Sequence, residues 1–150
     1  MAGTAVLAYD GSADAQRAVE RARELLAADK AVVVHVRVIP MPPIIGADPA
    51  GEQSDSPDAA QERQADRIVS EGVDAATKAG FEAEGVVKTA DSMTGVWRAL
   101  LDVADEHGAA AVVAGHRGIS RFRSALLGSV SNGLVNHAHI PVLVVPAADR

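Results

Sequence analysis

Cysteine is absent from this 150-residue chain, which excludes disulfide bonds, thiol catalysis and thiolate metal sites. Aromatic residues are scarce as well, at 3% of the sequence. Apolar residues nevertheless make up 48%, and most of them are Ala, Val, Leu and Ile. This content is enough for burial to offset chain entropy, and side chains of this kind suit helices packed against a β-sheet.

We also expect no segment for export or membrane insertion in this chain. Its first residues have neither the basic start nor the apolar run of a signal peptide, and no stretch approaches the ~18 apolar residues that span a bilayer. We therefore expect a cytoplasmic location and no membrane partner. A net charge of −6 repels polyphosphate strands, so we expect no nucleic-acid partner. A small phosphate ligand stays compatible with this charge, because a local nest of backbone N–H groups can bind it.

Several motifs of known chemistry are missing. The sequence contains neither the G-x-x-x-x-G-K-[ST] loop nor the G-x-G-x-x-G fingerprint, so P-loop and Rossmann dinucleotide sites lose their main support. It has no HExxH motif, and His137 and His139 stand two apart on a predicted helix, where they would face different directions. We expect no metal held by the protein's own side chains.

Strands and helices are predicted to alternate along the chain. The predicted strands are 5–9, 31–38, 81–88, 109–114 and 142–145, and the predicted helices are 15–26, 59–79, 94–107 and 128–139. This order predicts an α/β fold with a mostly parallel sheet covered by helices on both faces. The proline-rich segment 40–57 is predicted to be a mobile loop, and the length fits one domain over 1–150.

The loops after the strands at 5–9 and 109–114 are the candidate ligand site. In open α/β sheets, ligands bind beyond the carboxyl ends of the strands where the strand order reverses. The first loop holds Asp10, and the second holds Gly115 and Gly118 before a helix that starts at Gly128. Glycines let backbone approach a ligand closely and adopt positive φ, and the helix start at 128–131 offers free N–H groups and hydroxyls to a phosphate.

The spacing Gly115-x2-Gly118-x9-Gly128-Ser129 resembles the G-2x-G-9x-G-(S/T) signature of ATP-binding universal stress proteins. The resemblance extends over nearly the whole chain, through residues 6–12, His35-Val36 and 141–145. It implies a five-stranded parallel open sheet of order 3-2-1-4-5, the adenine nucleotide alpha hydrolase-like arrangement. It also implies ATP as ligand, with AMP or cyclic AMP as alternatives and Mg²⁺ bound with the nucleotide.

The family pattern assigns a role to each matching residue. The backbone of Val36 would read the adenine edge, Ala8 would line the base pocket, and Asp10 would sit by the ribose or Mg²⁺. The remaining residues would pass under the ribose and phosphates or hold the phosphates: Ala114, Gly115, Gly118, Gly128, Ser129, Val130 and Ser131.

Some of these side chains also fit a second role. Asp10 also fits a turn or helix-cap carboxylate, and His35 fits a half-buried structural histidine. His116 and Arg117 fit either phosphate ligands or solvated loop charges, and Arg121 and Arg123 fit either a lid over a triphosphate or an exposed loop. Trp97 is predicted to be core packing.

These observations favour a binding or sensing module over an enzyme, and no catalytic residue is assigned. Hydrolysis needs a group that orients water, and neither Asp10 nor His116 has a visible partner in the sequence. The alternatives are a slow ATP hydrolase and a nucleotide-free structural dimer. A homodimer is expected through the apolar strand at 142–145, because an unpaired sheet edge seeks a partner and the family commonly pairs this strand.

Overall fold

The computed structural model describes residues 3–39, 57–92, 94–116 and 128–147. Their elements alternate in the predicted order: β1(Gly3–Ala8), α1(Ala13–Leu25), β2(Ala28–Val38), α2(Pro57–Ala79), β3(Glu82–Ala90), α3(Thr94–Glu106), β4(Ala111–Gly115), α4(Ser129–His137) and β5(Val142–Val145). The predicted mobile loop lies outside the described residues, except for Pro57, which begins α2. Gly118 and the arginines at 117, 121 and 123 also lie outside them.

The strands form one five-stranded sheet in the order β3-β2-β1-β4-β5, and every neighbouring pair is parallel. The predicted fold class and strand order are therefore confirmed. The chain moves outward from β1 to β3, then returns to the other side of β1 with β4. The order reverses between β1 and β4, which puts the switch point at the centre of the sheet.

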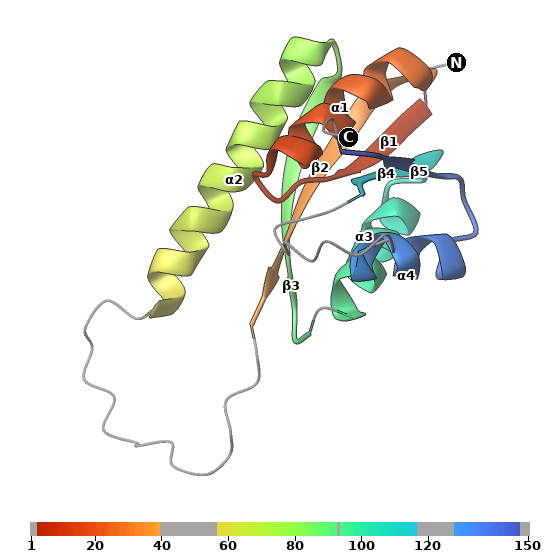
Figure 1. Ribbon diagram of the computed structural model, residues 1–150. Coiled ribbons are helices and arrows are strands. Elements are labelled where there is room, and N and C mark those ends of the chain that lie inside the picture. The colour runs from red at the N-terminus through yellow and green to blue at the C-terminus, as the bar shows by residue number, and fades with distance from the viewer. Residues whose placement is uncertain (1–2, 40–56, 93, 117–127, 148–150) are drawn as a thin grey trace, which may run out of the picture.

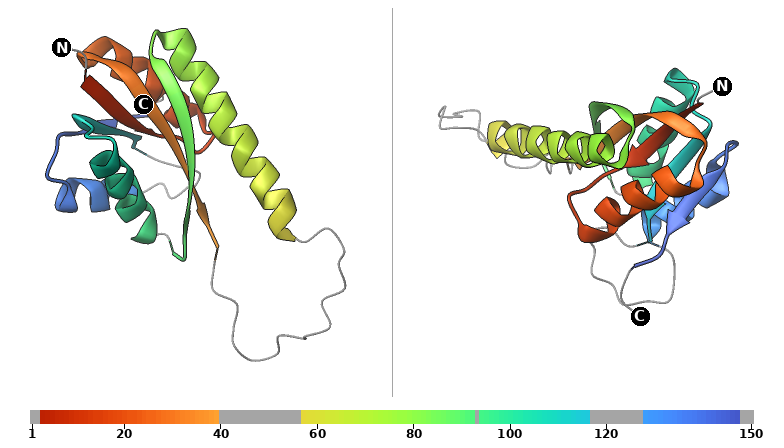
Figure 2. Two further views of the ribbon diagram at one scale, coloured as in Figure 1. Left: turned by 180° about the vertical axis from the view of Figure 1, so that it is seen from behind. Right: turned by 90° about the horizontal axis from the view of Figure 1, so that it is seen from above.

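Helices cover both faces of the sheet, and each face has its own apolar cluster (Figures 1 and 2). Helices α1 and α2 pack on one face around residues such as Leu7 and Val33, both at most 1% exposed. Helices α3 and α4 pack on the other face around Val6, Val34 and Leu100. Because successive strand residues point to opposite faces, a valine-rich strand such as β2 can serve both clusters.

Strands β2 and β3 run on past the end of β1, as Figure 1 shows. Their paired register extends from Lys30↔Glu82 to Val38↔Ala90. Pairing between β1 and β2 ends earlier, at Ala8↔Val34. The end of β2, residues 35–38, is therefore paired with β3 on one side and has no pairing with β1 on the other side.

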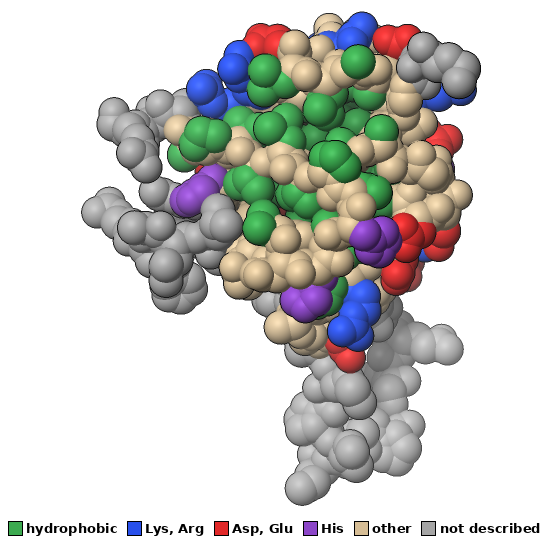
Figure 3. Space-filling view, turned by 90° about the vertical axis from the view of Figure 1, so that its right-hand side faces the viewer, with side chains coloured by type: hydrophobic (Ala, Val, Ile, Leu, Met, Phe, Trp, Pro, Cys, Tyr) green, Lys and Arg blue, Asp and Glu red, His purple; other side chains and the backbone are tan. Residues whose placement is uncertain are grey.

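Strand β5 forms one edge of the sheet, as predicted for residues 142–145. Its first three residues, Val142, Leu143 and Val144, are only partly buried. The side of the molecule on which this edge lies carries a gathering of hydrophobic side chains (Figure 3). In the described residues, β5 has a paired strand on one side only, so its outer backbone groups face outward.

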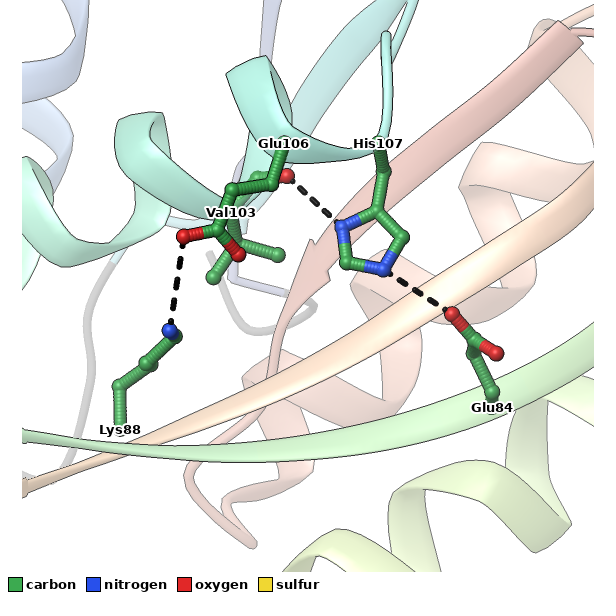
Figure 4. A network of polar contacts seen from close by, with 5 residues as sticks. All are labelled: Glu84, Lys88, Val103, Glu106 and His107. Carbon is green, nitrogen blue, oxygen red and sulfur yellow. Dashed lines mark hydrogen bonds and ion pairs between the residues drawn. The ribbon is translucent and has the colours of Figure 1, made fainter.

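The carboxyl end of α3 is tied to β3 by a small polar network (Figure 4). His107 donates from Nδ1 to the Val103 carbonyl at 3.0 Å, and its Nε2 lies 3.1 Å from Glu84 Oε1. Alongside, Lys88 Nζ lies 3.7 Å from Glu106 Oε1. These contacts stand at the opposite end of α3 from the switch point and fix that end of the helix to the sheet.

Candidate functional site

A pocket of about 420 Å³ lies at the carboxyl ends of β1, β2 and β4, where the strand order reverses. Every predicted site residue except Gly118, which is outside the described residues, lines this one pocket. The volume falls in the usual range for small-molecule sites. Its lining also includes residues that the sequence did not single out for it: Tyr9, Ser12, Ala15, Val34, Val38, Val96 and Leu100.

One end of the pocket is an apolar slot. Val34, Val36 and Val38 alternate along β2 and so share one face of the sheet. Val96 and Leu100 stand four residues apart on α3 and close the slot from the other side. Two layers of aliphatic side chains facing each other suit a flat apolar group such as a heterocyclic base.

The backbone of Val36 adds polar groups to this slot. In a parallel ladder, alternate residues send both N–H and C=O toward the same neighbouring strand. The Val34 carbonyl accepts from the Tyr9 N–H at 2.9 Å, so residue 34 and, two further on, residue 36 face the β1 side. Since β1 ends before reaching Val36, and no other described strand takes its place, this residue presents one donor and one acceptor to the pocket.

The turn after β1 brings the N-terminus of α1 to the site. Gly11 has a φ of 82°, a left-handed conformation that favours glycine. The Asp10 carboxylate accepts from the Ser12 N–H at 2.9 Å, and Ser12 Oγ in turn accepts from the Ala15 N–H at 3.1 Å as the N-cap of α1. Asp10 therefore stabilises this turn through Oδ1. Contact between Asp10 and a ligand stays a prediction.

His35 and Tyr9 form a structural pair among the residues that line the pocket. The half-buried His35 ring lies 2.9 Å from the Tyr9 carbonyl through Nδ1, and because a carbonyl only accepts, Nδ1 carries the proton. This contact agrees with the interpretation of His35 as a structural histidine. Burial raises the pKa of the Tyr9 phenol, and the nearby carboxylates of Glu71 and then Asp10 raise it further.

Two glycines of the signature are used for close packing. A Cβ atom on Gly115 would lie 3.2 Å from the Asp14 carbonyl oxygen, and one on Gly128 would lie 3.3 Å from the His116 carbonyl oxygen. Neither has the positive φ that glycine allows, because Gly115 ends an extended strand and Gly128 caps a helix; the described glycines with positive φ are Gly11, Gly80 and Gly108. Gly118, the other glycine to which the sequence analysis gave this freedom, lies outside the described residues.

The first turn of α4 supplies the polar end of the pocket. The first intrahelical bond runs from the Asn132 N–H to the Gly128 carbonyl at 2.9 Å. The N–H groups of Ser129, Val130 and Ser131 precede it and have no intrahelical acceptor. All three residues line the pocket, and the positive end of the helix dipole favours an anion there.

The two serines of this turn differ in what their hydroxyls do. Ser131 is 2% exposed, and its hydroxyl donates to the Gly115 carbonyl at 2.9 Å. That proton is therefore already used to tie α4 to the end of β4. Ser129 is exposed and lines the pocket, so its hydroxyl can turn toward a ligand.

Comparison with known proteins adds a decisive observation. The model of the universal stress protein family matches residues 1–146. The chain belongs to this family. A stretch of 41 residues is 56% identical to a universal stress protein of Mycobacterium tuberculosis, and it covers 27% of this chain but only 13% of that protein. The match thus spans a small part of that curated relative.

Solved structures of universal stress proteins resemble the whole chain. One from Archaeoglobus fulgidus in complex with dAMP is 26% identical, with a TM-score of 0.62 over 97% of this chain and 98% of that chain. Another, in complex with cAMP, is also 26% identical, with a TM-score of 0.66 over 97% of each chain. The adenine nucleotide alpha hydrolase-like arrangement is thereby confirmed together with the family.

The slot residues that sequence reasoning missed lie on two elements, β2 and α3. Val34 and Val38 could have been found, because they repeat at a period of two around Val36 on the same strand. Val96 and Leu100 could not, since nothing in the sequence indicates which face of α3 meets which strand. Among the described residues, no helix is long and apolar enough to cross a membrane, and no group of three or more candidate ligands gathers to hold a metal ion.

Proposed function

We propose that this universal stress protein binds an adenine nucleotide, with ATP and Mg²⁺ as its ligand, and acts as a sensor or regulator rather than as an enzyme. The ten predicted residues would form the site, with Gly118 completing the loop outside the described part of the chain. The observation that carries the proposal is the two-ended pocket, with an apolar slot at one end and a helix N-terminus at the other.

The slot suits adenine in particular. A donor and an acceptor side by side on the Val36 backbone match the N1 acceptor and the 6-amino donor of adenine. Guanine carries a proton on N1 and a carbonyl at position 6. The Val36 N–H would then face the N1–H donor of guanine, and the Val36 carbonyl would face its O6 acceptor. The relatives in complex with dAMP and with cAMP support an adenine ligand for this chain too.

The polar end suits a phosphate chain. Three N–H groups and the Ser129 hydroxyl converge there. Asp10 lines the same pocket and would repel phosphates on its own, which favours a nucleotide that arrives with Mg²⁺. AMP and cyclic AMP would use only the part of this end nearest the ribose, so the preference among nucleotides depends on how far the phosphates extend along α4.

Calorimetric titration with ATP and Mg²⁺ tests the proposal, and GTP is the matched control. We expect binding of ATP, at least about tenfold weaker binding of GTP because two hydrogen bonds are replaced by like-to-like contacts, and no release of ADP. Absence of binding by ATP, AMP and cyclic AMP would defeat the proposal. Release of ADP would favour the slow hydrolase instead, with Asp10 and His116 as the pocket groups to test.

The proposal includes a homodimer formed through β5 and a cytoplasmic location, both expected from the sequence. The partly buried, apolar edge strand at 142–145 supports the dimer, since a second copy could continue the exposed edge or cover the side chains beside it (Figure 3). We further propose that residues 1–150 act as one module, in which nucleotide occupancy alters a partner contact.

A further inference from the structure

Helix α4 is a short element with few anchors. It spans nine residues, Ser129–His137, and its first turn lines the pocket. The Ser131 hydroxyl ties that turn to β4. Leu134, 0% exposed, anchors the middle of the helix in the apolar cluster on this face of the sheet. Beyond these two anchors, α4 packs against α3 on the same face (Figures 1 and 2).

Trp97 fills a notch in α4 at Gly133. A Cβ atom on Gly133 would lie 2.1 Å from Trp97 Cδ1, 2.4 Å from Cγ and 2.6 Å from Nε1. Such distances are far shorter than contacts between non-bonded carbon or nitrogen atoms. The indole ring therefore lies directly against the α4 backbone, and any other residue at position 133 would have to move either the ring or the helix.

The same indole contacts the next turn of α4. The rings of Trp97 and His137 are stacked, with centroids 4.0 Å apart and planes 16° from parallel. His137 donates from Nδ1 to the Gly133 carbonyl at 2.9 Å, which holds the imidazole over the indole. Trp97 thus touches α4 at two positions one turn apart, which determines both the height and the tilt of the helix.

Helix α3 is itself fixed with respect to the pocket. The neighbouring residue Val96 and, one turn on, Leu100 line the base slot. At the far end, His107 and Glu106 bridge to Glu84 and Lys88 of β3 (Figure 4). A change at the Trp97–Gly133 contact is therefore taken up mainly by the short helix α4, at the end of the pocket proposed for the phosphates.

We propose that Trp97 is a positioning residue that sets the phosphate-binding turn of α4. The inference rests on the proposed function and extends it, because it predicts an effect on the phosphates alone. Displacing α4 moves the N–H groups of Ser129 and Val130 away from an anion but leaves the slot beside Val36 in place. Binding of ATP then weakens while binding of adenosine, which has no phosphate, does not.

Substitution Gly133→Ala tests the inference, with both ligands titrated into each protein. We expect a loss of about tenfold or more in ATP affinity and less than about twofold in adenosine affinity, since hydrogen bonds stretched beyond their normal range lose most of their strength. Val135→Ala is the matched control, because Val135 is 52% exposed on the same helix and does not line the pocket; it should change neither affinity.

A second variant distinguishes positioning from general damage. Combining Gly133→Ala with Trp97→Leu removes the overlap, and we expect it to restore part of the lost ATP affinity. The affinity stays below that of the wild-type protein because the stack on His137 is lost as well. If Gly133→Ala does not fold, as judged by circular dichroism, His137→Ala takes its place. His137 is exposed, and this substitution removes the ring that stacks on Trp97. It should lower the affinity for ATP and leave the affinity for adenosine unchanged.

Trp97 also provides a direct signal, since it is the only tryptophan in the chain. We expect ATP to change its emission in the wild-type protein and adenosine to leave the emission unchanged. Equal loss of both affinities, or full ATP affinity in folded Gly133→Ala, would overturn the inference. Failure of the wild-type protein to bind ATP at all would instead count against the proposed function, and the two failures are therefore distinguishable.

Discussion

The two serines of the α4 turn should respond in opposite ways to alanine substitution. Ser131→Ala removes the buried hydroxyl that donates to the Gly115 carbonyl at 2.9 Å. Loss of such a bond, with a partly buried carbonyl losing its donor, costs about 1–2 kcal/mol. Alanine returns about 0.5 kcal/mol through its higher helix propensity. We therefore expect a net loss of about 1 kcal/mol and a fall in Tm of about 2–4 °C.

Ser129→Ala is the matched variant one half-turn earlier. Its exposed hydroxyl has no structural partner among the described residues, so the substitution should leave Tm unchanged or raise it slightly through helix propensity. A hydrogen bond to a charged phosphate contributes about 1.5–3 kcal/mol. Its loss should weaken ATP binding by roughly ten- to a hundredfold.

Thermal unfolding by calorimetry and titration with ATP and Mg²⁺, both run on the two variants, separate these effects. Ser131→Ala should lower Tm and change affinity less than Ser129→Ala does. The reasoning would be refuted by an unchanged Tm in Ser131→Ala together with an affinity loss as large as that of Ser129→Ala. Such a result would mean that the Ser131 hydroxyl serves the ligand and not the Gly115 carbonyl.

Two further predictions concern Tyr9 and β5. Tyr9 is the only tyrosine, and its folded-state pKa is raised above 10.0. Its contribution to stability should therefore be constant below about pH 10 and fall above it, because the unfolded chain ionises first; urea unfolding at several pH values checks this, and Tyr9→Phe should make the fall smaller. Val144→Lys should convert a dimer to a monomer in sedimentation; an unchanged dimer would contradict the proposed interface.

Most of the fold could be predicted because its signals are local. Valine-rich runs indicated buried parallel strands, and apolar residues such as Ala15, Ala18 and Val19 at helical spacing indicated α1, where all three are buried. The strand at 142–145 was predicted with its observed bounds. Strand β2 begins earlier than predicted, at Ala28, because Ala28 pairs with Gly3 and Lys30 pairs with Thr4 and Glu82, with Asp29 at a register shift between them.

The site could be predicted only in part, because a pocket is made by tertiary contact. The switch-point rule and the glycine signature led to residues on the loops after β1 and β4. They could not reveal that Gly115 and Gly128 pack closely against Asp14 and His116, or that the Ser131 hydroxyl is used internally. The role of Trp97 was equally hidden, because its contact with Gly133 joins two helices far apart in the sequence.

The early departure of β1 from the sheet has a consequence for how base preference can change in this protein. The groups proposed to face the base at position 36 belong to the main chain, so they are the same for valine and for almost any replacement. Only proline lacks the N–H. If the proposed role of Val36 holds, a survey of substitutions other than proline would find position 36 tolerant although its backbone discriminates between bases. A change of base preference at this position would then require β1 to be lengthened or shortened rather than the side chain to be exchanged.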